Sequence, residues 1–175
     1  MKGIFLSAAL VTASGFVFVG SAEDRAHAPA AGNAAFDRIK GLEGTWTGTA
    51  GQVGSEAGEV TVRYRVTAGG NAVEETLFAG TAHEMVTMYY LDDDGVSLVH
   101  FCASGNHPKM RLSSGADPAT MTFRFAEAVN FDVAETHMHD GVLYLLGGDR
   151  LRTEWLSWVD GKPGATVRFD LTRAK

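Results

Sequence analysis

Hydrophobic and polar residues alternate along most of this chain, in the period-two pattern of half-buried β-strands. The clearest run has Val60, Val62 and Tyr64 separated by polar or charged residues. Successive side chains of a strand point to opposite faces, so this run predicts one buried face and one solvated face. The same alternation at 119–126 and 164–173 predicts further strands of this kind.

Residues that favour tight turns separate these runs, as at 68–71, 92–95 and 147–149. Short connections of this kind join neighbouring strands as hairpins. The expected strands are 45–51, 58–67, 71–79, 83–91, 95–103, 108–113, 119–126, 133–146, 150–159 and 164–173. The chain is therefore predicted to be all-β, an antiparallel up-and-down barrel of about ten strands, since closure leaves no exposed sheet edge.

One short helix is expected before the first strand. Phe36, Ile39 and Leu42 recur at helical spacing within residues 34–42, and Gly44 is expected to end the helix. Neither an internal repeat nor a second domain is evident in the pattern. The expected organisation is a single barrel domain over residues 34–175.

The first 33 residues have a different composition. Lys2 precedes an apolar run, and small residues at 20–22 precede an acidic pair, the succession typical of a secretory signal peptide. Residues 1–22 are therefore expected to be a signal peptide, followed by a flexible leader at 23–33. The apolar run is too short for a membrane span, so the sequence predicts a periplasmic or secreted protein rather than an integral membrane protein.

Charge and cysteine content narrow the range of partners. The formal net charge is −6 and no basic run is present, so binding to nucleic acid is not expected. A single cysteine, Cys102, cannot form a disulfide within the chain. Its position within an expected strand predicts that it is buried.

The entry to the first strand resembles that of a known barrel class. The run Gly44-Thr-Trp46-Thr-Gly48 follows the expected helix and looks like the entry motif of calycin-type barrels, which include the lipocalins. In those folds the tryptophan closes one end of the barrel. Segments 80–90, 100–102, 105–110 and 137–139 resemble an uncharacterised family of exported bacterial proteins with lipocalin-like barrels. This resemblance implies a fold and a compartment, and no activity.

A weaker resemblance connects the same motif to nitrobindin-like haem barrels, which carry Gly-x-Trp-x-Gly. Those proteins ligate haem through a histidine near the C-terminus, whereas the last histidine of this chain is His139. Haem is therefore the less favoured cofactor.

Candidate chemistry is concentrated between His83 and His139, which hold five of the six histidines and the only cysteine. His100 and Cys102 are two residues apart, as are His137 and His139, so each pair is expected on one face of its strand. Imidazole and thiolate are ligands for zinc and copper. These four residues are the candidate metal ligands, and they are expected to converge at one end or in the lumen of the barrel.

A second group of residues suggests a pocket for a small molecule: Glu75, His83, His107 and Trp155. Glu75 is a carboxylate in a core-like strand, expected either inward beside an arginine or histidine, or at the rim. His83 is expected to open a strand. We expect His100 to point inward, with Phe101 packed under the helix.

Three interpretations of the histidines remain open from sequence. They form a buried polar network with Glu75, Glu84, Tyr89 or Tyr90, a metal site, or a pocket for an organic ligand. The sequence contains no nucleophile elbow or phosphate-binding loop, and no catalytic residue is assigned. It therefore favours an exported barrel that binds a small ligand or metal, or one with a structural role, over an enzyme.

Overall fold

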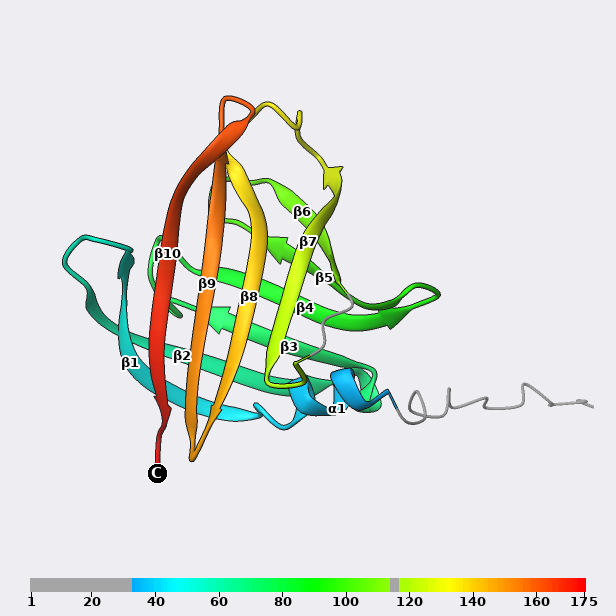
Figure 1. The fold of residues 1–175 in the computed structure, drawn as a ribbon, viewed down its shortest axis with the longest axis vertical. Coiled ribbons are helices and arrows are strands. Elements are labelled where there is room, and N and C mark those ends of the chain that lie inside the picture. Colours follow the sequence, from blue (N-terminus) through cyan, green and yellow to red (C-terminus); the bar gives the residue numbers. More distant parts are fainter. Residues whose placement is uncertain (1–32, 114–116) are drawn as a thin grey trace, which may run out of the picture.

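Ten strands and one short helix make up the fold in a computed structural model, which describes residues 33–113 and 117–175 (Figure 1). The elements are α1 (Ala34–Lys40), β1 (Gly44–Gln52), β2 (Gly58–Thr67), a 3-10 turn (Ala68–Gly70), β3 (Ala72–Leu77), β4 (Met85–Asp92), β5 (Gly95–Phe101), β6 (His107–Leu112), β7 (Thr120–Val129), β8 (His137–Gly147), β9 (Arg150–Val159) and β10 (Lys162–Arg173). The predicted signal peptide (1–22) and nearly all of the predicted leader (23–33) lie outside the described residues.

Each strand pairs antiparallel with its neighbours in sequence, and β1 also pairs with β10, so the sheet closes into a barrel (Figure 1). The predicted up-and-down barrel is confirmed. Gly48 of β1 lies opposite Val60 of β2 on one side and Leu171 of β10 on the other. A Cβ on Gly48 would collide with the backbone of Asp170, which explains a glycine at this point of the entry motif.

Strand alternation places the core inside the barrel. In β2, Val60, Val62 and Tyr64 are buried while Arg63 and Arg65 are exposed, as the pattern predicted. Burial of such side chains supplies about 1.5–3 kcal/mol each and is the main force that closes the sheet.

Helix α1 covers one end of the barrel (Figure 1). The side chain of Asn33 accepts hydrogen bonds from the backbone N–H groups of Ala35 and Phe36, and so caps the helix N-terminus. Phe36 and Ile39 are buried in the core. The helix ends at Lys40 with Gly41 as its cap, earlier than the predicted end at Gly44, which already belongs to β1.

Trp46 lies at this closed end, as the resemblance to calycin-type barrels implied. Its indole N–H donates to the carbonyl of Leu42, and the Arg173 guanidinium lies 4.4 Å from its ring centroid. Arg173 also donates to the carbonyls of Gly41 and Glu43. The last strand is thereby tied to the helix–strand connection.

The ladder between β7 and β8 is short and stops well before the ends of both strands. Their ladder pairs only Thr120–Phe123 with Tyr144–Gly141. Beyond it, the side chain of Asp140 accepts the backbone N–H of Phe125 at 3.1 Å, in place of a main-chain carbonyl. A register shift between Met138 and Asp140 in the β8–β9 ladder accompanies this change.

Two of the predicted strand starts, at 133 and His83, lie in turns. The strand predicted from 133 begins at His137, because Asp132 accepts the backbone N–H of Ala134 in a loop turn. The strand predicted from His83 begins at Met85, and His83 lies in the preceding turn.

Within residues 33–113 and 117–175 no helix has the length and apolar character needed to span a membrane.

Candidate functional site

A buried carboxylate lies at the centre of a polar chain inside the barrel. Glu75 is fully buried on β3 and accepts hydrogen bonds from the hydroxyls of Tyr64 at 2.6 Å and Tyr89 at 2.8 Å. Glu75 was expected inward beside an arginine or histidine, or at the rim. It is inward, but its partners are tyrosines from the adjacent strands β2 and β4.

The chain continues from Glu75 to His100 through Thr87. The Thr87 hydroxyl lies 3.0 Å from Nδ1 of His100, and it is among the groups that lower the pKa of Glu75. A hydroxyl has one proton, so when it donates to the carboxylate it accepts from His100 Nδ1–H. In that arrangement a neutral His100 carries its proton on Nδ1 and a lone pair on Nε2.

Burial governs the ionisation of this chain. It lowers the pKa of His100 to about 4, so the imidazole is neutral at pH 7. It also raises the pKa of Glu75, against the opposing effect of the hydroxyls that donate to this carboxylate. Burial and the neighbouring Glu75 raise the pKa values of Tyr64 and Tyr89, so both phenols remain protonated donors.

Hydrogen bonding is incomplete at Nε2 of His100, the ring nitrogen that does not face Thr87. Its ring stacks on the indole of Trp155, with ring centroids 5.7 Å apart. Among the described residues, the buried Nε2 of His100 has no hydrogen-bond partner, and neither do the buried Nε1 of Trp155 and Oγ1 of Thr153. Trp155 and Thr153 both point inward from β9, and together these atoms offer one acceptor, one donor and one hydroxyl.

The four residues predicted to line a pocket do not come together. Glu75 and Trp155 are both interior, connected through Thr87 and His100. His83 is exposed in a turn. His107 begins β6 and lies against Phe101, which is itself 42% exposed rather than packed under α1 as expected.

The four predicted metal ligands are also divided. His137 and His139 contact each other, whereas His100 points inward as expected and belongs to the polar chain. Cys102 follows the end of β5 and is half-buried, not mid-strand and buried; its Sγ lies 4.0 Å from Sδ of Met85. In the described part of the chain, no three His, Cys, Asp or Glu side chains form a group that could hold a metal ion.

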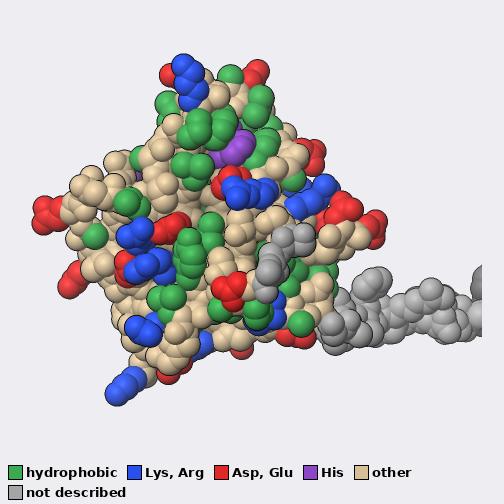
Figure 2. All heavy atoms as spheres, in the orientation of Figure 1, with side chains coloured by type: hydrophobic (Ala, Val, Ile, Leu, Met, Phe, Trp, Pro, Cys, Tyr) green, Lys and Arg blue, Asp and Glu red, His purple; other side chains and the backbone are tan. Residues whose placement is uncertain are grey.

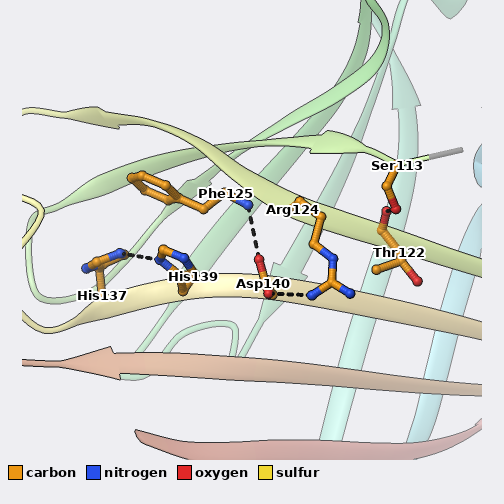
Figure 3. Close-up of polar contacts among 7 residues, drawn as sticks. All are labelled: Ser113, Thr122, Arg124, Phe125, His137, His139 and Asp140. Carbon is orange, nitrogen blue, oxygen red and sulfur yellow. Dashed lines mark hydrogen bonds and ion pairs between the residues drawn. The ribbon is translucent and has the colours of Figure 1, made fainter. Parts of the chain in front are cut away.

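The His137–His139 pair lies where β7 and β8 separate (Figure 3). Nε2 of His137 is 3.0 Å from Nδ1 of His139, and Nδ1 of His137 is 2.7 Å from the carbonyl of Glu135. The ring of His139 is stacked between those of Phe125 and Trp158, with centroid distances of 4.5 and 4.0 Å. The opening between the strands is thus filled by rings.

Sequence reasoning missed Thr87, Thr153 and Tyr64 as parts of the interior site. Each lies on the buried face of an alternating strand, where a polar side chain needs a hydrogen-bond partner. Thr87 is directly opposite His100 in the β4–β5 ladder. A search for polar residues on predicted buried faces could have found them.

Comparisons with known proteins identify the fold alone. No family model matches the chain, and no curated protein matches it. A solved structure of a protein of unknown function, from the DUF3598 family of Nostoc punctiforme, is similar with a TM-score of 0.54 and 10% sequence identity. The match covers 78% of this chain and 48% of that one, so this chain spans about half of its length.

Proposed function

We propose that the barrel binds a small, mainly apolar molecule that donates a hydrogen bond to Nε2 of His100. The observation that carries this proposal is the buried Nε2 of His100, which has no hydrogen-bond partner among the described residues and belongs to a ring stacked on Trp155. A buried polar atom without a partner costs about 1–3 kcal/mol. A ligand that completes the bond recovers part of this free energy, which favours binding.

The other unpartnered atoms nearby define the polar part of the ligand. Trp155 Nε1 donates and the Thr153 hydroxyl can do either, so a hydroxyl or amine group on the ligand suits the site. His100 is neutral at pH 7 and Glu75 already accepts from the hydroxyls of Tyr64 and Tyr89. An uncharged ligand is therefore favoured, because a buried charge would lack a counter-ion.

The end of the barrel opposite α1 is the proposed entrance. Five of the six exposed large hydrophobic side chains of the described residues lie at this end: Val53, Phe101, Val129, Val133 and Val159. Met85 and Met138 are partly buried there against the core, and methionine side chains adapt readily to a guest. The interior is otherwise filled by large side chains, so the ligand has few heavy atoms.

We also propose that the protein is periplasmic or secreted and that its barrel is lipocalin-like. The succession of residues in 1–22 supports export to the periplasm or beyond, and the Trp46 closure supports a lipocalin-like barrel. Mass spectrometry of protein exported by a bacterial host tests the location. We expect a mature chain that begins near Glu23, and retention of Met1 would contradict export.

Phenol and anisole form a matched pair of probes for the interior site. They share an aromatic ring, but only phenol has a hydroxyl proton to donate to Nε2 of His100. We expect phenol to raise the melting temperature of the full chain more than anisole does, since a ligand of the native state stabilises it. Indole and N-methylindole repeat the comparison with an N–H donor.

Variants of His100 test whether the stabilisation by phenol depends on Nε2 of this residue. His100→Phe keeps a ring against Trp155 and removes the acceptor, so the preference for phenol over anisole should disappear. His100→Gln retains an acceptor and should recover part of it, while His83→Gln, in an exposed turn, should behave as the wild type. The proposal is wrong if neither donor probe stabilises the wild type, or if His100→Phe retains the preference.

A further inference from the structure

We propose that His137 and His139 form a second, independent site, at which they chelate a divalent transition-metal ion, copper(II) most tightly. The two imidazoles project from β8 toward each other at the opening beside β7 (Figure 3). This site lies apart from the polar chain of His100 and does not depend on the proposed interior ligand.

The hydrogen bond to Glu135 determines which nitrogen of His137 is free. A carbonyl oxygen only accepts, so Nδ1 of His137 carries a proton and donates it to Glu135 at 2.7 Å. In neutral His137 the Nε2 lone pair then accepts from Nδ1–H of His139. Metal-binding histidines commonly donate their second N–H to a backbone carbonyl in this way, which orients the ring and raises its basicity.

The separation of the two facing nitrogens suits a shared metal ion. At metal–nitrogen distances of about 2.0–2.1 Å, two ligands are about 2.9 Å apart at a right angle and about 3.3 Å apart in a tetrahedron. His137 Nε2 and His139 Nδ1 are 3.0 Å apart, nearer the right angle of tetragonal copper(II). Because the hydrogen bond aligns both nitrogens with each other, each ring must turn by about 45° to direct its lone pair at an ion beside the line that joins them.

Proton balance is simple for the neutral pair. His137 keeps its proton on Nδ1 and offers Nε2, whereas His139 transfers its proton from Nδ1 to Nε2 and offers Nδ1. No net proton is released, and the shared hydrogen atom leaves the line between the two nitrogens. Since only these two protein ligands are assigned, water completes the coordination.

The surroundings hold both rings and favour a cation. His139 is stacked between Phe125 and Trp158, and His137 lies 4.8 Å from the ring of Phe131. The connecting segment 130–136 contains two carboxylates and neither lysine nor arginine. Figure 2 shows histidine among hydrophobic side chains on one face of the barrel. His139 is partly exposed whereas His137 is buried, so an ion would reach the pair from the side of His139.

Copper(II) binding to the untagged full chain tests the proposal. Trp158 is stacked on His139, so bound copper(II) should quench its fluorescence, and electron paramagnetic resonance should show coupling to two imidazole nitrogens. We expect one ion per chain by calorimetric titration. His139→Phe preserves a ring between Phe125 and Trp158, and it should weaken binding about tenfold or more and abolish the two-nitrogen signal.

Three controls separate the possible outcomes. His137→Phe should have the same effect as His139→Phe, while His83→Gln should have none, because His83 lies in a separate turn. His100→Phe should leave copper binding intact, so failure of the interior site would not affect this result. A wild-type signal that survives His139→Phe, or that His83→Gln removes, would overturn the assignment.

Discussion

The imidazole ring of His100 stacks on the indole of Trp155, with ring planes inclined by 29°. The contact joins β5 to β9 across the barrel interior. His100 is the last member of the polar chain that includes Glu75 and Thr87. Polar atoms of His100, Trp155 and Thr153 have no hydrogen-bond partner among the described residues. The stability of the barrel and its proposed ligand site therefore involve the same side chains.

Burial of His100 makes stability depend on pH. Its pKa is about 4 in the folded chain against an ordinary 6.5, so between these values the unfolded chain binds a proton that the folded chain does not. The free energy of unfolding should therefore fall as pH drops from 6.5 to 4, by up to about 3 kcal/mol for this group. The raised pKa of Glu75 makes the free energy of unfolding rise as pH falls. This contribution is present both in the wild type and in a variant of His100.

Urea denaturation of wild type and His100→Gln between pH 7 and pH 4 isolates this effect. The stability advantage of the wild type should shrink as pH falls, and a constant difference would contradict it. The exposed His83→Gln protein serves as the control.

The two tyrosines that donate to Glu75 should be energetically coupled. Tyr64→Phe and Tyr89→Phe should each reduce the free energy of unfolding by about 1–3 kcal/mol, since each removes a buried hydrogen bond to the same carboxyl group. Because the partner is shared, the loss in the double variant should differ from the sum of the single losses. Tyr144→Phe is the matched control: its bond to Glu154 is only part-buried and should contribute under about 1 kcal/mol.

Gly141 makes room for Trp155. A Cβ at this position would lie 2.6 Å from Cζ3 of Trp155, so Gly141→Ala should displace the indole from His100. Overpacking of this kind costs about 1–3 kcal/mol, and the tryptophan emission spectrum should change. Gly58→Ala is the control, since no atom lies within 4 Å of its added Cβ. Equal melting temperatures for the two variants would contradict this account.

Arg173 connects the last strand to the closed end of the barrel. Arg173→Lys removes the forked donation to the carbonyls of Gly41 and Glu43 and weakens the contact with Trp46. We expect a loss of about 1–2 kcal/mol in the free energy of unfolding. Arg65→Lys, which alters an exposed ion pair with Glu74, should change stability by less than about 1 kcal/mol. A similar small effect at both positions would argue against a structural role for Arg173.

The barrel itself could be predicted from local sequence. Strands β2 and β9 have the bounds that alternation and turn residues predicted, because each of those signals acts within a few neighbouring residues. The two-residue period predicted that His137 and His139 share a face, and they contact each other. It did not decide the face of His100, because both faces of β5 carry apolar residues; His100 points inward although Phe101 does not pack under α1. The errors fall at strand ends, where the turns of His83 and Asp132 replace the ladder.

Local sequence patterns were sufficient to predict a closed antiparallel barrel and the residue types of its candidate chemistry. Which side chains contact one another depends on the tertiary structure. Glu75 contacts two tyrosines because the β2–β3 and β3–β4 registers place them beside it, and His137 and His139 occupy an opening that arises where the β7–β8 ladder stops. Alternation assigns a residue to a face, whereas its partner depends on register and irregularities set by the whole sheet.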